Sequence, residues 1–310
     1  MPLSTEKFTG ICVRMLKNSA FVFLLAILLG FIMPGSSPLT EPLITPALML
    51  MMAFSLTEVD LRARGALGSS LIGFFLNYGL LSGLIIFLAY TLENETLRNG
   101  FVVMAAVPPA VAVLPMTRLL SGDVLLSLYA ETASYLASPI LMPVMIFTFT
   151  SRTGVSLGYL VETTLLLILV PALASRYIRR LPLDPVLPIN AGFFLVTYTV
   201  IGLNIGAPWE LIGPVGPIAL ARTFGIGMAV YAASALAGSS ECRRISYTLL
   251  GSFKNLGLAA AVALLLFGPE AAIPATVCIL AETTFYIVLY LASFQKASFR
   301  ITYNLKSKKI

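Results

Sequence analysis

Ten long apolar runs divide this sequence, and Gly, Pro and charged residues separate them. A helix that crosses the hydrocarbon core of a bilayer needs about 20 mainly apolar residues. We therefore expect ten membrane-spanning helices, near residues 19–34, 39–56, 67–91, 98–120, 123–149, 155–177, 185–206, 212–237, 243–267 and 271–295. Only 11% of the residues are charged, against about a quarter in soluble proteins. The sequence thus predicts an all-α polytopic protein with the lipid bilayer as its solvent.

The basic residues lie on one side of this arrangement. Cytoplasmic segments of membrane proteins are enriched in Lys and Arg. If the N-terminus is cytoplasmic, the inner segments hold sixteen of the 20 Lys and Arg residues, and the outer segments hold only Arg98 and Arg152. We expect a multi-pass protein of the cell inner (plasma) membrane with both termini in the cytoplasm. Because the basic residues act as orientation signals, the net charge of +6 does not indicate nucleic-acid binding.

Several chemistries are absent from the sequence. The chain has no histidine, and Cys12, Cys242 and Cys278 are far apart. A histidine proton relay, a histidine-ligated metal and a Ser-His-Asp triad are therefore excluded, and the cysteines do not have metal-ligand spacing. No nucleophile–base pair is apparent. We expect neither an enzyme nor a bound cofactor or metal.

The two halves of the chain carry related segments. Leu128-Tyr-Ala-Glu-Thr-Ala-Ser-Tyr135 in the fifth span is similar to Ile279-Leu-Ala-Glu-Thr-Thr-Phe-Tyr286 in the tenth. A duplicated unit of five spans must insert its second copy upside down, which is the inverted repeat of many secondary transporters. We expect a first repeat over residues 1–150 and a second over residues 151–310.

The fourth span of each half is predicted to be broken. Val107-Pro108-Pro109-Ala110 removes backbone donors from the first. Gly251-Ser252-Phe253-Lys254-Asn255-Leu256-Gly257 permits unwinding of the second. Broken backbone at membrane depth needs protein or a water-filled cavity around it, and matched interruptions indicate a binding site. Pro108, Pro109, Lys254 and Asn255 are therefore candidate site residues, although a simple proline kink is the alternative for either span alone.

Four ionisable residues lie well inside spans: Glu131, Arg222, Lys254 and Glu282. A charged group there needs a partner or water. We expect Lys254 to meet Glu131, the freed carbonyls of its own broken span, or an anionic substrate. A static Lys254–Glu131 pair is the structural alternative to a working one. Arg222 is expected to face an anion or to pair with Glu282, and Glu282, the symmetry mate of Glu131, could carry a proton.

The segments Pro42-Leu-Ile-Thr-Pro-Ala-Leu-Met-Leu-Met-Met-Ala-Phe-Ser-Leu-Thr57, Val107–Ser127, Lys254–Ala263 and Phe267–Pro274 resemble the bile acid:sodium symporter family, within the bile/arsenite/riboflavin transporter superfamily. The resemblance is to a divergent prokaryotic-type member. It implies a ten-helix fold in which broken helices 4 and 9 cross, with a panel domain of helices 1, 2, 6 and 7 and a core domain of helices 3–5 and 8–10. It also implies elevator-like or rocking alternating access.

The sodium ligands that the resemblance implies are mostly missing. A serine–asparagine pair of the family corresponds to Val113 and Leu114, and its shared glutamate to Leu250. The helix 5 serine is kept as Ser127, a threonine ligand falls on Glu131 and a glutamine ligand on Lys254, while Asn77 is similar in place to a helix 3 glutamine. A hard cation needs such oxygens. Ser127, Asn77, Leu114 and Leu250 are thus vestigial sodium positions, and the ammonium of Lys254 could fill the slot of the ion.

We therefore predict a secondary active transporter of a small, bile-acid-like or carboxylate anion that is independent of sodium or coupled to protons on a Lys254/Glu131 pair. Sodium-coupled symport, an inorganic ion/proton antiporter, an arsenite exporter and a non-transporting membrane receptor are the alternatives. The exporter family has a functional cysteine in helix 4, and the fourth span here has none. The protein could be a monomer or a homodimer.

Overall fold

The structure is a computed structural model that describes residues 13–55, 57, 67–150, 157–206 and 209–307. Within these ranges every regular element is a helix and none is a strand, which confirms the predicted helical class. Six helices are long and apolar enough to cross a membrane, or seven if the pair Leu24–Ile32 and Pro34–Met51, bent by 93°, is one span. The count of ten spans is not confirmed and stays a prediction.

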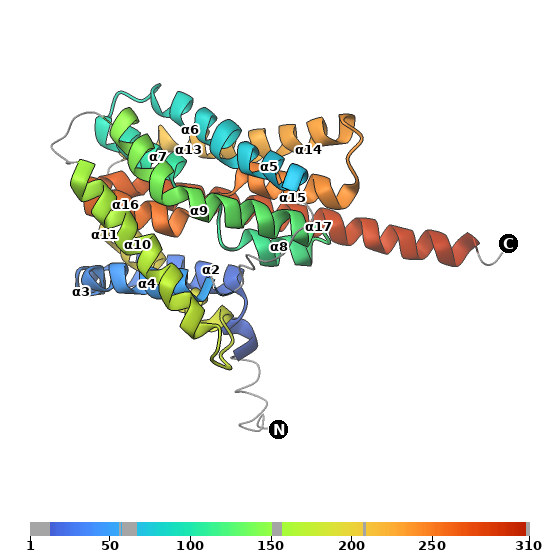
Figure 1. The fold of residues 1–310 in the computed structure, drawn as a ribbon, viewed down its shortest axis with the longest axis horizontal. Coiled ribbons are helices and arrows are strands. Elements are labelled where there is room, and N and C mark those ends of the chain that lie inside the picture. Colours follow the sequence, from blue (N-terminus) through green and yellow to red (C-terminus); the bar gives the residue numbers. More distant parts are fainter. Residues whose placement is uncertain (1–12, 56, 58–66, 151–156, 207–208, 308–310) are drawn as a thin grey trace.

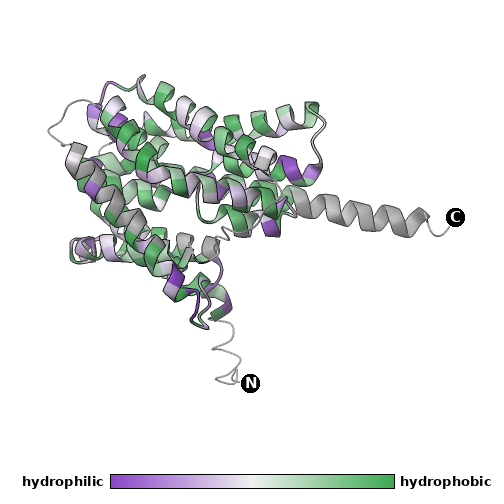
Figure 2. Cartoon of the chain, in the orientation of Figure 1, coloured by the Kyte–Doolittle hydropathy of each residue, from purple (hydrophilic) through white to green (hydrophobic). Residues whose placement is uncertain are grey.

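Large apolar side chains face outward from many of the helices. Phe87 and Ile140 are each 70% exposed, and Leu236 is 91% exposed. Figure 2 shows that hydrophobic residues occur along most of the helices of the bundle. Polar side chains such as Asn77 and Lys254 are instead fully buried. This distribution is unfavourable in water and suits a bilayer, where the tails of the lipids are as apolar as leucine.

Four helices pack together on one side of the molecule (Figure 1): α2 (Ser19–Ile32), α4 (Ile44–Ser55), α10 (Leu157–Ile178) and α11 (Val186–Asn204). The short elements η1 (Pro34–Ser36), α3 (Ser37–Thr40) and η2 (Glu41–Leu43) join α2 to α4. Helix α11 lies along both α2 and α4, and α10 lies along α4. Gly192 allows the close approach of α11, because a Cβ atom there would lie 3.0 Å from the carbonyl oxygen of Ala47.

The remaining helices form the larger part of the fold. They are α5 (Leu67–Phe74), η4 (Phe75–Leu81), α6 (Ser82–Ala89), α7 (Glu95–Ala106), α8 (Val113–Leu119), α9 (Val124–Phe149), α12 (Trp209–Ile212), α13 (Val215–Leu220), η5 (Ala221–Gly225), α14 (Ile226–Leu236), α15 (Glu241–Ser252), α16 (Leu256–Phe267), η6 (Pro269–Ala272) and α17 (Ile273–Ser307). Helix α7 contacts α6, α9 and α16, and α15 contacts α14 and η4.

The break predicted at Val107–Ala110 is present between α7 and α8. The residue before a proline is disfavoured in the helical region, and Val107 is extended with φ −70° and ψ 154°. Pro108 and Pro109 then supply no backbone N–H groups, so α7 ends at Ala106 and α8 begins only at Val113. The last carbonyl groups of α7 are thereby left without partners in their own helix.

The second predicted break lies between α15 and α16. Phe253 is extended with φ −114° and ψ 131°. Asn255 begins α16, because its side-chain oxygen accepts a hydrogen bond from the N–H of Leu258 at 3.0 Å. The backbone N–H of Asn255 donates to the carbonyl oxygen of Pro108 at 2.9 Å. The two interruptions therefore touch each other inside the protein.

Two further irregular segments are π-helical. Element η4 lies between α5 and α6, and η5 lies between α13 and α14. A π-helix places an extra residue in a turn and often occurs at functional sites. Asn77 lies in η4 and Arg222 lies in η5. Hydropathy gave no indication of either segment.

Candidate functional site

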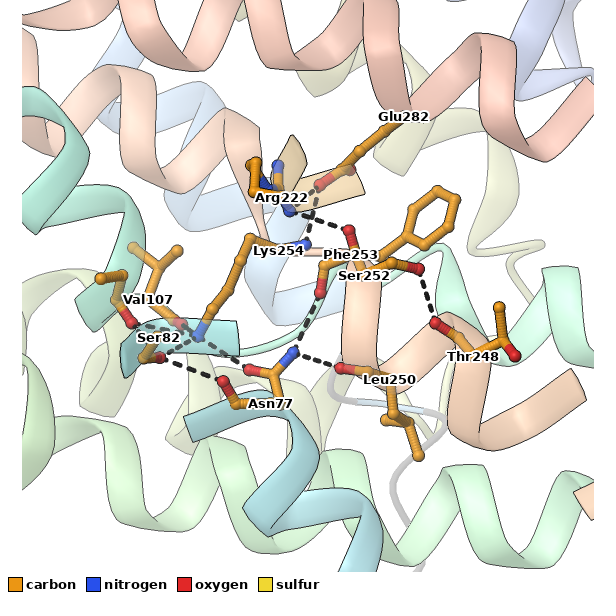
Figure 3. A network of polar contacts seen from close by, with 11 residues as sticks. Asn77, Ser82, Val107, Arg222, Thr248, Leu250, Ser252, Phe253, Lys254 and Glu282 are labelled. Carbon is orange, nitrogen blue, oxygen red and sulfur yellow. Dashed lines mark hydrogen bonds and ion pairs between the residues drawn. The ribbon is translucent and has the colours of Figure 1, made fainter. Parts of the chain in front are cut away.

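The side chain of Lys254 is fully buried where the two helix interruptions meet. Its ammonium donates hydrogen bonds to Asn77 Oδ1 at 2.8 Å, Ser82 Oγ at 2.9 Å, Val107 O at 2.9 Å and Ala105 O at 3.0 Å. The Nζ atom also lies 4.5 Å from the centre of the Tyr78 ring, within the range of a cation–π contact. Figure 3 shows the lysine side chain pointing into this group of oxygens.

Two of these oxygens belong to the broken end of α7. The carbonyls of Ala105 and Val107 have lost their helical partners because the chain leaves the helix before Pro108. A helix C-terminus carries partial negative charge, which favours a cation. Lys254, which lies in the break between α15 and α16, therefore supplies the hydrogen-bond donors and the positive charge that the end of α7 lacks.

Asn77 donates hydrogen bonds to the carbonyl groups at the broken end of α15, as Lys254 does at the end of α7. Its amide Nδ2 donates to Leu250 O at 2.8 Å and to Phe253 O at 3.0 Å. Its Oδ1 accepts from Lys254. One buried amide thus links the ends of the two interrupted helices, and the π-helical turn of η4 carries it into position.

Arg222 and Glu282 form a buried ion pair beside the second break. The Arg222 Nη2 atom lies 2.7 Å from Glu282 Oε1, and the two side chains are 0% and 9% exposed. The same Nη2 donates to Ser252 O at 2.8 Å. Glu282 Oε1 also accepts the backbone N–H of Lys254 at 3.0 Å. Of the two predicted arrangements for Arg222, pairing with Glu282 is the one present.

Tyr135 joins both breaks on the side of α9. Its hydroxyl donates to Pro109 O at 3.0 Å and accepts from Asn255 Nδ2 at 3.2 Å. In the sequence this tyrosine marks only the internal repeat, and no pattern there indicates its contacts with the two breaks. Ser82 was also missed, since a serine in an apolar run gives no signal of its own.

The predicted contact between Lys254 and Glu131 is wrong. All four hydrogen-bond acceptors of the Lys254 ammonium come from η4, α6 and the end of α7, whereas Glu131 lies on α9 and is buried there. The prediction assumed that the lysine would point toward the fifth span. Helix α15 ends at Ser252 and Phe253 is extended, and the Lys254 side chain contacts the end of α7 instead.

Of the vestigial sodium positions, Asn77 and Leu250 are in contact, since the Asn77 amide donates to Leu250 O. Ser127 is buried and lies 3.0 Å from the hydroxyl of Thr117. Leu114 and Leu250 are buried apolar side chains. In the part of the chain that the structure describes, no group of three or more His, Cys, Asp and Glu residues could hold a metal ion.

Two interrupted helices that meet at a buried cluster of charges are typical of secondary transporters. A family comparison agrees with this class. The model of the Sodium Bile acid symporter family matches residues 45–206, which is more than half of the chain, and the protein belongs to this family. The resemblance noted from the sequence is thereby confirmed, and the family is one of transporters. No curated protein matches the chain.

The matched range includes Asn77, Ser82 and the break after α7. Arg222, Lys254 and Glu282 lie beyond its end. The family match therefore does not include these three charged residues, and their arrangement is known from the structure alone.

Proposed function

We propose that this protein is a secondary active transporter of a small organic anion that works by alternating access without sodium. The observation that carries the proposal is the fully buried ammonium of Lys254, which holds four oxygens at the crossing of the broken helices. In transporters with interrupted helices, unwound carbonyls and the C-terminal ends of half-helices coordinate the coupling cation. Here a side chain of the protein provides the positive charge.

The proposed architecture is two inverted repeats of five helices, over residues 1–150 and 151–310. Breaks in corresponding helices, α7/α8 and α15/α16, support it. So do the π-helical segments, since η4 lies in the third predicted span of the first half and η5 in the third of the second half. The packing of α2, α4, α10 and α11 supports a panel of helices 1, 2, 6 and 7 that moves against a core of the others.

The hydrogen bonds that the carbonyl groups at both breaks accept support sodium independence. At the end of α15, Leu250 O and Phe253 O accept from the Asn77 amide, and Ser252 O accepts from Arg222. At the end of α7, Ala105 O and Val107 O accept from Lys254. Na⁺ needs oxygens whose lone pairs are available. Binding at either end would have to displace an N–H donor that already satisfies these carbonyls.

An anionic substrate is supported by the charges that surround the crossing. Lys254 and Arg222 are both at this point, and α16 begins there, so that the positive end of its dipole faces the same region. The bile acid in the name of the family is itself an organic anion. A bile-acid-like or smaller carboxylate substrate fits these features.

A proton is the coupling ion that the site favours. Since Lys254 does not meet Glu131, we assign the proton to Glu282 in place of the lysine pair. Glu282 Oε1 holds both Arg222 and the backbone N–H of Lys254. Protonation of this carboxylate would weaken both contacts and loosen the break between α15 and α16. Binding of a proton would in this way change the conformation of the segment that moves during transport.

The test is transport by the purified protein in liposomes, with Na⁺ and pH gradients imposed separately. Uptake and solid-supported-membrane currents are expected to respond to the pH gradient and to be unchanged by Na⁺. A current driven by Na⁺ alone would overturn the proposal and favour sodium symport. A thermal-shift screen with steroid acids, keto acids, pantoate-like acids and arsenite identifies the substrate class. Stabilisation by arsenite alone would favour the exporter alternative, and binding without transport would favour a receptor.

Orientation is tested in intact cells that express the protein. We propose an inner-membrane location with both termini in the cytoplasm, supported by the distribution of Lys and Arg. Reporter domains fused to either end should be active only inside the cell.

A further inference from the structure

The four oxygens around the Lys254 ammonium form a shell that three separate elements contribute. Asn77 comes from η4, Ser82 from α6, and Ala105 and Val107 from the end of α7. Each oxygen lies 2.8–3.0 Å from Nζ. An ammonium has three protons to donate, so the shell has one acceptor more than the lysine can satisfy with separate hydrogen bonds. A set of oxygens arranged around a charge in this way is typical of a site for a monovalent cation.

Bonds other than those to the lysine hold the shell in place. The Ser82 hydroxyl lies 2.7 Å from Ala105 O and 3.1 Å from Asn77 O. The Asn77 amide is fixed by Leu250 O and Phe253 O. The backbone of Lys254 is held separately, because its N–H donates to Glu282. Truncation of the lysine side chain would therefore leave the four oxygens directed at the same point.

We propose that the Lys254 side chain occupies a latent binding site for a small monovalent cation. A free ammonium ion, K⁺ or a primary alkylammonium ion binds there when the side chain is removed. The proposal rests on the sodium independence proposed above, since it explains that independence by a charge that fills the site permanently. The observed distances suit ions of the size of ammonium. Na⁺ is smaller, so it is expected to bind more weakly than K⁺ or NH₄⁺.

The variant Lys254→Ala tests this directly. It removes the atoms of an n-propylammonium ion and keeps the backbone N–H that donates to Glu282. Thermal unfolding of the purified variant is measured while n-propylammonium, NH₄⁺, K⁺, Na⁺ or choline chloride is added at constant ionic strength. The melting temperature should rise with the concentration of n-propylammonium, NH₄⁺ and K⁺, because a ligand that binds only the folded state stabilises it. Choline, which has no N–H group and is larger, should have no effect.

Lys254→Met is the matched control. Methionine fills the space of the lysine stem without a charge, so the same ions should leave its melting temperature unchanged, as they should in the wild-type protein. Equal shifts in all three proteins, or no shift of Lys254→Ala with any ion, would overturn the proposal. Lys254→Ala could prove stable only when a cation is added during purification. In that case, recovery of monodisperse protein in n-propylammonium supports the proposal in place of the melting-temperature titration. Failure to recover it with every ion tested would count against the site.

The thermal-unfolding result for Lys254→Ala and the result of the transport assay are independent of each other. Sodium-driven transport by the wild-type protein would overturn the proposed function while leaving the response of Lys254→Ala to be measured. An absent response in Lys254→Ala would overturn the latent site even if wild-type transport is sodium-independent.

Discussion

The carbonyl oxygen of Pro108 accepts a hydrogen bond from the backbone N–H of Asn255, at 2.9 Å, where the two helix interruptions meet. The contact joins segments that are far apart in the sequence. Proline cannot donate, so at this position it offers only an acceptor. The neighbouring break supplies the donor.

Replacement of the Asn255 side chain should destabilise the start of α16, beside this backbone contact. Asn255→Ala removes the cap of α16 and the donor to Tyr135, and loss of a cap costs about 1 kcal/mol. Asn255→Asp keeps an oxygen for the N–H of Leu258 and should retain most of the thermal stability. Melting curves of the two variants in detergent check this expectation. Equal destabilisation by Ala and Asp would show that the cap is not the important contact.

The Arg222–Glu282 pair can be tested by a double-mutant cycle. Removal of one partner of a buried pair leaves a buried charge and costs about 3–5 kcal/mol. Arg222→Met and Glu282→Leu should each lower the melting temperature strongly, while the double variant should be more stable than either single one. The unfolding transitions of the four proteins give the coupling directly. Additive losses in the double variant would contradict a direct pair.

Tyr135→Phe removes a hydroxyl that contacts both breaks. The change leaves Pro109 O and Asn255 Nδ2 without this partner, and an unsatisfied buried polar group costs about 1–3 kcal/mol. We expect lower thermal stability and slower substrate uptake. Tyr286→Phe at the repeat-related position is the control, because that side chain is only partly buried. Similar effects of the two changes would argue against a special role for Tyr135.

A charge exchange distinguishes the observed contacts of Lys254 from the pair predicted from sequence. Lys254→Glu combined with Glu131→Lys would restore function if the two side chains were partners. Since the ammonium of Lys254 contacts Asn77, Ser82 and the end of α7, the exchange should not restore uptake lost in Lys254→Glu. Uptake by the double variant at the wild-type rate would contradict the geometry of the site.

Glu282→Gln tests the proposed path of the proton. The amide keeps an oxygen for Arg222 and for the N–H of Lys254 but cannot lose or gain a proton near neutral pH. Exchange of labelled for unlabelled substrate should continue, while accumulation driven by a pH gradient should disappear. Both are measured in the same liposomes. Accumulation that still follows the pH gradient in Glu282→Gln would place the proton elsewhere.

The parts of this site that follow from local chemistry could be predicted from the sequence. Two consecutive prolines at 108 and 109 end a helix in any environment, and the break after Ala106 is present. The buried charges were found because ionisable residues inside apolar runs are rare. Their partners were harder to assign: Glu282 was one of two alternatives for Arg222, and the pairing of Lys254 with Glu131 was wrong.

The errors have a common physical origin in the backbone. The direction of the Lys254 side chain depends on the unwound residues beside it, and the position of Asn77 depends on a π-helical turn. Neither changes the pattern of apolar residues along the chain. Ser82 was missed for the same reason, because its role arises only when the end of α7 lies next to it.

Lys254 also limits where the energy for transport can come from. An ion in solution has a different chemical potential on each side of a membrane, and its passage can drive another solute uphill. An ammonium that is covalently part of the chain returns with the empty carrier in every cycle and has no such difference. It can hold the broken helices together, but it can perform no net work. Any accumulation of substrate must be driven by a species that leaves the protein, and the direction of transport reverses when the gradient of that species reverses.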